Sequence, residues 1–439
     1  MSGRIDVEEL RVGMFIHLDL GWMSHPFPVG SFRITHAQQI DKIRGLGLKQ
    51  LRWSPEKSEL TAPQRAADPT PETSPETSPE TSPAAAAHAP APAAETPAQA
   101  AERQRRTLLV AQRASAELCQ KQFDEAGMAW RSAQDWVVAR PEQARKDSEG
   151  LARALLDKML PDGDMCIRLL TCNAGDGASA HAMNVAVISL LMGRVLGLDE
   201  EEMLDLGIGA LMHDVGKIDL PERLRHVHER FGKEDLAAYR DHVAHGVMHG
   251  KRMGLTPGAL HVLAQHHELA DGSGFPLRLK IDRVCVAARI VALVNRYDNM
   301  CNPPVLTQAH TPHEALSLLF AQAKSQFDAG MLNAFIRMMG VYPAGSVVQL
   351  TDDRFALVMS VNSTRPLKPN VLVHDPKLPR EEALHLNLMS TPDLGIRRSL
   401  KPAQVPAAAL DYLAPRPRVA YFFEAARTAA APQDEALSA

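Results

Sequence analysis

The stretch ALMHDVGKIDLPE, residues 210–222, places a histidine and an aspartate side by side at the end of an apolar run. The apolar residues before His213 indicate a helix, and Gly216 lets the backbone loosen after it. Adjacent side chains on a regular helix diverge by about 100°, so His213 and Asp214 can bind one ion only near a helix end. The stretch therefore predicts a helix terminus that presents metal ligands, with Lys217 as a nearby cation.

The residues around this stretch are rich in helix signals. Asp199 and Glu202 have the spacing of a capping box at the start of the helix that leads to the histidine. Gly197 ends the helix before it. No alternating strand pattern interrupts residues 161–340. We therefore expect an all-helical domain over 161–340 that carries the site.

The remainder of the chain divides by composition and periodicity. A Pro-Glu-Thr-Ser repeat has almost no apolar side chains, so it cannot bury a core and predicts a disordered linker. Alternating apolar residues near both ends predict strands. The fold class expected is mainly α, an all-helical core between small modules. The other segments expected are an N-terminal α+β module (1–55), the linker (56–103), a helical lead-in (104–160), a β module (341–426) and a tail (427–439).

Composition limits the classes of function. Hydrophobic residues make up 45% of the 439 residues, so most of the chain is globular. The net charge of −4 gives no general attraction to nucleic acid polymers or anionic membranes. The five cysteines form no CxxC pair, and the charged N-terminus resembles no signal peptide. The apolar run Val185–Met192 is too short to span a bilayer. We expect a soluble cytoplasmic protein with reduced thiols.

Histidines concentrate within the predicted helical domain. Imidazole and carboxylate ligands together suit Fe, Mn or Zn better than Mg or Ca. Six candidates exceed the ligands of one catalytic ion with an open position, so two ions with a bridging Asp214 are expected. Two such ions activate water and stabilise the attacking and leaving oxygens of a phosphoryl displacement. His245 and His249 share the helix face of His242, and the pattern leaves the choice among these three open. The candidate set is His181, His213, Asp214, His242, His266 and His267.

Four motifs in this order carry a family resemblance. They are HDVGK (213–217), HVAHG (242–246), HHELADGSGFP (266–276) and RIVALVNRYDN (289–299). With them, residues 175–340 resemble the HD-GYP family, phosphodiesterases of the bacterial second messenger cyclic di-GMP. The stretch VEELRVGMFIHLDLGWMSHPF (7–27) is similar to a small domain of unknown function that often precedes HD-GYP domains.

The resemblance implies a fold, a reaction and a set of site residues. The fold would be the helical HD core, and cyclic di-GMP would be hydrolysed to linear pGpG, with further cleavage to GMP left open. Asp214 and Lys217 would be catalytic, Lys217 contacting the scissile phosphate. One ion would be held by His181, His213 and Asp214, and the other by Asp214, His242, His266 and His267. The substrate side of the pocket would include Lys217, Asp271, Gly274, Phe275 and Pro276.

Two departures from the family pattern bear on activity. Phe275 stands where the family has its tyrosine, which keeps a ring and loses a hydroxyl. Asn295 stands where the family has a further aspartate ligand, and an amide oxygen is a weaker ligand than a carboxylate. Asp298, one helical turn on, is a candidate substitute. Asn295 is therefore the doubtful member of the metal-ligand set.

Three interpretations follow from the sequence. The first is an active cyclic di-GMP phosphodiesterase with two divalent transition-metal ions, Fe or Mn. The second is a catalytically impaired module that binds cyclic di-GMP or a protein partner, for which Asn295 is the motive. The third is an HD phosphohydrolase of another nucleotide, against which the HHELADGSGFP loop argues. In each, the terminal modules are available for a protein partner.

Overall fold

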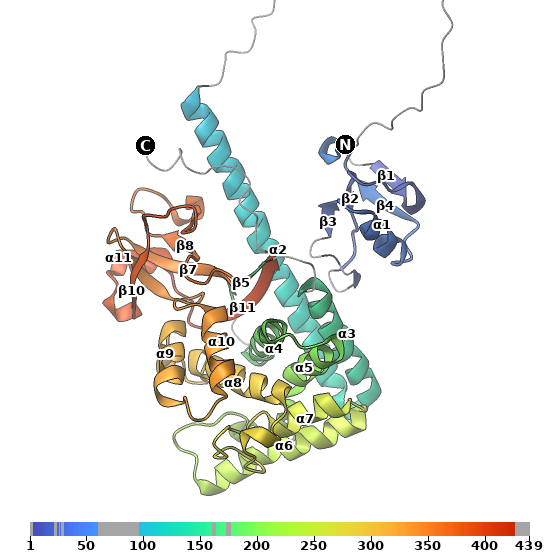
Figure 1. Ribbon diagram of the computed structural model, residues 1–439, viewed down its shortest axis with the longest axis vertical. Coiled ribbons are helices and arrows are strands. Elements are labelled where there is room, and N and C mark those ends of the chain that lie inside the picture. Colours follow the sequence, from blue (N-terminus) through green and yellow to red (C-terminus); the bar gives the residue numbers. More distant parts are fainter. Residues whose placement is uncertain are drawn as a thin grey trace, which may run out of the picture. The chain divides into compact units, whose positions relative to one another are not determined.

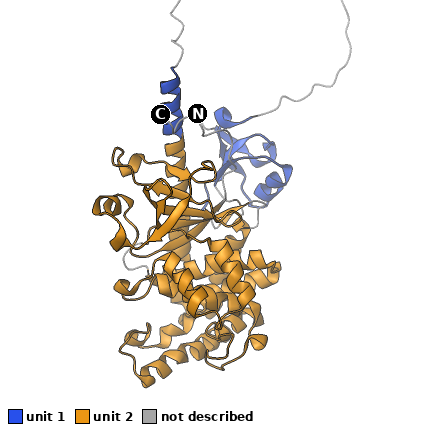
Figure 2. Cartoon of the chain, turned by 60° about the vertical axis from the view of Figure 1, so that its left-hand side comes forward, with its two compact units in different colours: residues 1–21, 29–107 blue, residues 22–28, 108–439 orange. Residues whose placement is uncertain are grey.

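The computed structural model describes residues 3–21, 24–25, 27, 30–59, 96–159, 164–172 and 177–425. Most of the expected linker, residues 60–95, and the tail 427–439 lie outside these residues. The chain forms two compact units (Figure 2). Unit 1 comprises residues 1–21 and 29–107, and unit 2 comprises residues 22–28 and 108–439.

Unit 1 contains a four-stranded antiparallel sheet in the order β1-β4-β2-β3. Ile16, Ile34 and Ile43 are fully buried, so one face of the sheet and helix α1 share an apolar core. The sequence predicts β2 and β4 of this sheet, and it does not predict β1 or β3. The elements are β1 (Gly3–Asp6), β2 (Phe15–His17), β3 (Ser31–Arg33), α1 (Ala37–Arg44) and β4 (Gln50–Trp53).

Two long helices follow. Helix α2 spans Pro97–Ala139 and helix α3 spans Pro141–Met159. Pro141 suits the first turn of α3, because a proline there lacks only an N–H that would have no helical partner. Helix α2 begins at Pro97, inside the segment 56–103 expected to be a linker, because its Ala, Gln, Glu and Arg residues favour a helix despite few apolar side chains.

The helical core is built around α4 (Gly177–Leu196), most of whose side chains are buried. By length and hydropathy α4 could cross a membrane, but 78% of its 18-residue apolar stretch is buried inside the fold, as in the core helix of a globular domain. Six further helices complete the helical core below and beside it in Figure 1. These are α5 (Glu200–Met212), α6 (Lys233–Met253), α7 (Pro257–Gln265), α8 (Val286–Cys301), α9 (Pro312–Gln322) and α10 (Ala329–Met339). Among them, α5 and α8 make the most extensive contacts with α4.

Local signals place the ends of these helices as expected. The side chain of Asp199 accepts from the backbone N–H of Glu202, and Glu202 in turn accepts from the N–H of Asp199. Short 3-10 helices join the longer elements. They are η1 (Val7–Glu9), η3 (Pro55–Lys57), η4 (Val215–Asp219), η5 (Glu222–Leu224), η6 (Ile281–Arg283), η7 (Leu306–Gln308), η8 (Arg380–Glu382) and η9 (Pro402–Gln404).

The C-terminal sheet recruits a strand that the sequence did not predict. Strand β5 (Met165–Leu170) lies within the segment 161–340 expected to lack strands, and it pairs with both β7 and β11. All six of its residues are buried. A strand covered on both faces shows no alternation, so periodicity cannot distinguish it from a helix segment. The β module therefore does not begin at residue 341.

The remaining strands pair antiparallel in the order β10-β6-β7-β5-β11, with β8 paired to β7 and β9. Tyr421 and Phe422 of β11 are fully buried, and β11 packs on α4. The sheet is thereby continuous with the helical core. Its other elements are β6 (Val347–Leu350), β7 (Phe355–Asn362), β8 (Asn370–Val373), β9 (His385–Asn387), β10 (Ile396–Leu400), α11 (Ala407–Leu413) and β11 (Ala420–Ala425).

Candidate metal centre

All six predicted ligands stand at or beside helix ends or on the bodies of helices. His213 is the C-cap of α5, and Asp214, with φ −98° and ψ 10°, precedes η4. This departure from helical geometry lets the two adjacent side chains face the same space. His266 likewise caps the C-terminus of α7. His181 and His242 come from the bodies of α4 and α6.

The structure brings all six side chains into two groups that share one residue. His181, His213 and Asp214 form the first group. Asp214, His242, His266 and His267 form the second. In each group the candidate ligand atoms lie within 4.8 Å of one another. This compactness suits an ion whose ligands stand about 2.0–2.2 Å from it.

The two oxygens of Asp214 divide between the groups. Its Oδ2 lies 3.4 Å from Nε2 of His213 and 3.8 Å from Nε2 of His181. Its Oδ1 lies 3.6 Å from Nε2 of His242 and 3.9 Å from Nε2 of His266. Each histidine group therefore has one oxygen of this carboxylate close to it.

Hydrogen bonds at Nδ1 fix which nitrogen of each imidazole faces the cluster. The Nδ1–H of His213 donates to the carbonyl of Ala210 at 2.8 Å. Those of His242 and His266 likewise donate to backbone carbonyls three residues earlier, at 2.5 and 3.0 Å. The Nε2 lone pair of each ring is then directed inward, as in histidines that bind metals.

Several inward-facing atoms have nothing to bond to among the described residues. Oδ1 of Asp214 is buried without a hydrogen-bond partner. The same holds for the Nε2 atoms of His242, His266 and His267. A buried polar atom without a partner is costly, and a cation removes that cost for lone pairs. The residues present therefore fit divalent metal ions.

Burial and neighbouring charges keep these groups in the form that binds metals. Burial lowers the pKa of the His266 and His267 imidazoles well below the ordinary value, and neighbouring histidines lower it further. Burial alone would raise the pKa of the Asp214 carboxyl, but Lys217 and His213 hold it well below its usual range. The imidazoles are thus neutral and the carboxylate charged at neutral pH.

Lys217 lies beside the cluster as predicted from the HDVGK motif. Its Nζ is 2.6 Å from Oδ2 of Asp214 and 5.4 Å from the ring centre of Tyr239. Burial would lower the pKa of Lys217, but Asp214 raises it above its ordinary value. The lysine is therefore a cation at the edge of the site, with 20% of its side chain exposed.

Asp298 orients His181. Its Oδ2 accepts from the Nδ1–H of His181 at 2.6 Å, while its Oδ1 accepts from the side-chain amides of Asn184 and Asn302. Asp298 belongs to neither candidate ligand group. The hypothesis that it replaces a missing carboxylate ligand is thus not supported, because its oxygens are engaged in holding the ring and the two amides.

Asn295 is buried on the same helix but makes a different contact. Its Oδ1 accepts from Nδ2 of Asn299 at 2.5 Å, and the same amide donates to the Asn295 carbonyl. The amide oxygen expected to face the first ion is therefore already bonded within α8. Its role as a ligand stays a prediction.

The HHELADGSGFP loop is held by a residue that the sequence analysis did not single out. Both oxygens of the buried Glu268 accept from backbone N–H groups, those of Leu277 and Leu279, at 2.7 and 2.8 Å. A side chain at Gly274 would meet the backbone of His267 and Leu269. The loop is thus closed tightly over the end of α7.

The predicted substrate-side residues take distinct places in this loop. The ring of Phe275 stacks on His267, with centroids 4.4 Å apart, and the guanidinium of Arg240 lies 5.1 Å from the Phe275 ring centre. Asp271 accepts from the backbone N–H and hydroxyl of Ser273, which makes it a turn residue here. Pro276 is exposed. Phe275 therefore packs against a candidate ligand as well as bordering the site.

The structure also shows which of the three histidines on one face of α6 joins the cluster. Nε2 of His249 lies 2.8 Å from Oδ2 of Asp219, so His249 ties α6 to η4. His245 belongs to neither ligand group. His242 alone of the three joins the cluster.

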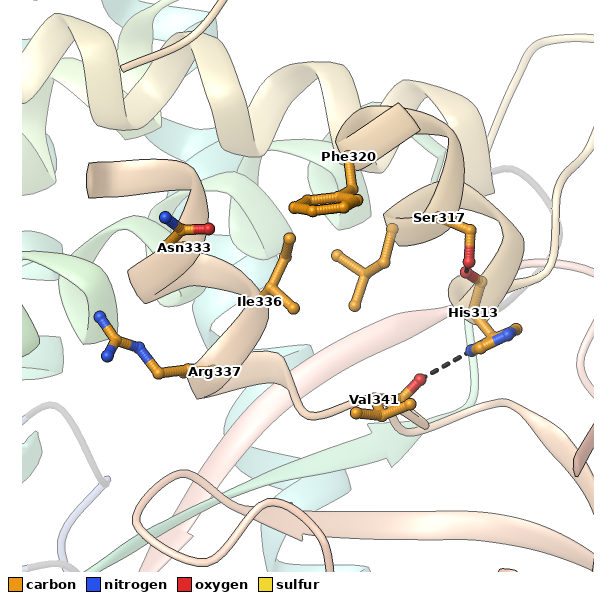
Figure 3. Close-up of a pocket in the computed structure, with 8 residues that line it drawn as sticks. His313, Ser317, Phe320, Asn333, Ile336, Arg337 and Val341 are labelled. Carbon is orange, nitrogen blue, oxygen red and sulfur yellow. Dashed lines mark hydrogen bonds between the residues drawn. The ribbon is translucent and has the colours of Figure 1, made fainter. Parts of the chain in front are cut away.

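A separate pocket lies between α9 and α10 (Figure 3). Its volume is about 470 Å³, and it shares no lining residue with the histidine cluster. His313 donates from Nδ1 to the carbonyl of Val341 at its rim. The pocket is lined by His313, Leu316, Ser317, Phe320, Asn333, Ile336, Arg337 and Val341.

Comparison with known families agrees with this fold and site. Residues 165–331 match the HD domain family, and residues 2–153 match a domain of unknown function, DUF3391. The fold and the histidine-aspartate cluster thus define an HD-domain protein. Residues 165–331, which carry the cluster, are therefore similar to HD domains, and a DUF3391 match precedes them in the chain.

Individual proteins that resemble this chain do so at low sequence identity. A cyclic di-GMP phosphodiesterase of Pseudomonas aeruginosa is 25% identical over 381 residues, which cover 85% of each chain. A 3′3′-cGAMP-specific phosphodiesterase of Vibrio cholerae is 27% identical over 36% of this chain and 30% of that one. Among solved structures, an HD-GYP-type protein from Bdellovibrio bacteriovorus aligns with a TM-score of 0.40 at 14% identity, covering 76% of this chain and 98% of that one.

Proposed function

We propose that this protein is a metal-dependent phosphodiesterase that hydrolyses cyclic di-GMP to linear pGpG. The observation that carries the proposal is the division of the Asp214 oxygens between two histidine groups, each with Nε2 lone pairs directed inward. The relative from Pseudomonas aeruginosa, which aligns over most of both chains, supports the choice of substrate.

The ions proposed are two divalent transition metals, Fe or Mn. When bound, such ions activate water for attack and stabilise charge on a phosphodiester. The imidazoles of the two groups would hold them through Nε2, and the Asp214 carboxylate would be available to both groups. The buried Nδ1 hydrogen bonds keep the rings from rotating away, so the site is preorganised.

Lys217 is proposed to contact the scissile phosphate. Its ammonium stands at the partly exposed edge of the cluster, 2.6 Å from Oδ2 of Asp214. A phosphodiester placed against both histidine groups would lie within reach of this cation. Lys217 would then donate to a phosphate oxygen as a point charge.

The test is hydrolysis of cyclic di-GMP by anaerobically purified protein whose metal content is measured on the same sample. We expect pGpG to accumulate in the wild type and not in Asp214→Asn, since the amide removes the charge shared by both groups. Asp282→Asn, at an exposed carboxylate on η6, is the matched control and should hydrolyse like the wild type. Equal rates in all three proteins would contradict the proposal.

A second candidate is a cyclic di-GMP-binding module with impaired catalysis, motivated by the neutral Asn295. A wild type that binds the nucleotide with both ions present but does not hydrolyse it would favour this candidate. Because one relative is named for 3′3′-cGAMP, that nucleotide belongs in the same assay. Faster hydrolysis of 3′3′-cGAMP would move the proposal to that substrate.

The proposal also covers where the protein acts in the cell. We place the protein in the cytoplasm, where cyclic dinucleotides are made and consumed, with the terminal modules available to a protein partner. Fractionation of the native host followed by detection of the chain tests the location. Recovery of the chain with the membrane after a high-salt wash would contradict it.

A further inference from the structure

Strand β11 is joined to the helical core by two asparagine side chains. Nδ2 of Asn184 and Nδ2 of Asn302 both donate to the carbonyl of Val419, at 2.9 Å each. In return, Asn302 Oδ1 accepts from the N–H of Val419, and Asn184 Oδ1 accepts from that of Tyr421, at 2.8 Å each. Strand β11 packs on α4, the helix that carries His181 (Figure 1).

The same two amides reach the metal cluster. Each also donates to Oδ1 of Asp298, whose other oxygen holds His181. A continuous set of hydrogen bonds therefore connects Val419 to a candidate metal ligand through one carboxylate. The start of β11 is fixed relative to the first histidine group.

Arg418 directly precedes this junction. Its side chain is partly buried, and Nη1 lies 3.5 Å from the carbonyl of Asn302 at the end of α8. No carboxylate lies within ion-pair distance of it among the residues that the structure describes. One long hydrogen bond leaves most of the guanidinium donors free for another acceptor.

His226 is near enough to both Arg418 and the cluster for their charges to affect its pKa. Burial lowers the pKa of His226 and Lys217 lowers it further, while Asp214 raises it; His181 and then Arg418 make smaller contributions to the lowering. One imidazole therefore senses both the HD aspartate and Arg418.

A partly buried guanidinium without a counter-charge suits an anionic ligand. Its planar donors match two oxygens of a phosphate, and a partly desolvated contact of this kind is stronger than one in water. A cyclic dinucleotide carries two phosphodiesters, so one can occupy the metal cluster while cations nearby meet its other oxygens.

We propose that Arg418, supplied by the C-terminal β module, binds a phosphate of the cyclic dinucleotide substrate. This inference rests on the proposed function and extends the site beyond the helical HD core. A structural alternative is that Arg418 only interacts with the carbonyls at the C-terminus of α8, as basic residues often do. That role predicts an effect on stability and none on substrate affinity.

The experiment compares Arg418→Gln and Arg418→Lys with wild type. The matched control is Arg398→Gln, which removes the same charge from strand β10, where Arg398 contacts Gln349. Loss of a charge-assisted hydrogen bond is expected to raise KM and the calorimetric Kd for cyclic di-GMP by about 10- to 100-fold. Arg418→Lys should recover part of this loss, and Arg398→Gln should match wild type. Metal content and Tm should stay at the wild-type values in all variants.

Two results would overturn the inference. One is a KM and Kd for Arg418→Gln equal to those of Arg398→Gln. The other is loss of bound metal or a large fall in Tm in Arg418→Gln, which would assign a structural role. A wild type that binds cyclic di-GMP without hydrolysing it contradicts the proposed function instead, and the Kd comparison still tests Arg418. A wild type that does not bind the nucleotide contradicts both.

Discussion

Nδ1 of His181 lies 2.6 Å from Oδ2 of Asp298, a carboxylate that is fully buried. The pair fixes the imidazole so that Nε2 faces His213 and Asp214. Carboxylates that hold the second nitrogen of a metal-binding histidine orient the ring and raise its basicity. The first histidine group is therefore supported from α8 although α8 contributes no member to it.

Asp298→Asn is expected to weaken metal binding by the first group by about 10- to 100-fold. The amide keeps the shape of the side chain but loses the charge that holds the Nδ1–H of His181. The measurement is metal retained per chain after dialysis against a graded chelator. Asp282→Asn serves again as the exposed control. Retention by Asp298→Asn equal to that of the control would show that the pair does not support the ion.

Asn295→Ala is expected to retain both ions, because the Asn295 amide is bonded to Asn299. His181→Ala, measured beside it, should lose the ion of the first group. The readout is metal stoichiometry after dialysis, followed by the hydrolysis rate. Metal loss in Asn295→Ala as large as in His181→Ala would restore residue 295 to the ligand set.

Replacement of the glycine by alanine should have very different effects on stability in the motifs HDVGK and HVAHG. A side chain on Gly216 would collide with the backbone of His242 and Gly246, whereas one on Gly246 meets only ordinary contacts. Gly216→Ala should lower the free energy of unfolding by about 3 kcal/mol or more and disperse the cluster. Gly246→Ala should change it by about 1 kcal/mol at most, since alanine favours the helix. Urea unfolding of both variants measures these free energies, and similar stabilities would refute the packing argument.

Glu268→Gln tests the anchoring of the HHELADGSGFP loop. Glutamine offers one acceptor where two backbone N–H groups need one each, so one is left unpaired at a cost of about 1–3 kcal/mol. We expect lower stability and a raised KM with both ions retained. Glu234→Gln, at an exposed position of α6, is the control. A KM unchanged from that control would mean that the loop is held by other contacts.

Acid should destabilise the metal-free protein through the buried imidazoles. The folded-state pKa values of His242, His266 and His267 are lowered by burial, so between the ordinary value of about 6.5 and these lowered values the unfolded chain binds more protons. Stability is then full above about pH 6.5 and falls as the pH drops below it. In chelator-treated protein, Tm should fall less between pH 7.5 and 5.5 in His267→Gln than in wild type. His261→Gln, at an exposed position, should follow wild type, and an equal slope in His267→Gln would contradict the linkage.

Sequence reasoning reached the residues whose spacing is local. The sequence shows two adjacent pairs of candidate ligands at predicted helix ends, His213 with Asp214 and His266 with His267. Glu268 was equally visible within its motif, and a buried glutamate before a glycine-rich loop could have suggested an anchor. Its two acceptors bond to residues 277 and 279, a geometry that the sequence does not display.

The parts that sequence reasoning missed depend on contacts between distant segments. Asp298 and His181 are 117 residues apart, and Asn184 reaches Val419 across 235. No periodicity encodes such a pair, because the two partners belong to segments that lie far apart in the sequence. Strand β5 was not predicted for a related reason. Its partner strands lie in the C-terminal sheet, and because it is buried on both faces it has no alternation of apolar and polar residues.

The most direct test of the account is the metal content and cyclic di-GMP hydrolysis rate of one anaerobically purified sample. Asp214 serves both histidine groups, so the account predicts about two transition-metal ions per chain, with pGpG formation that rises with occupancy. Asp214→Asn should lose both the ions and the activity. Full hydrolysis by protein that holds one ion or none, or an Asp214→Asn variant that keeps wild-type activity, would contradict it.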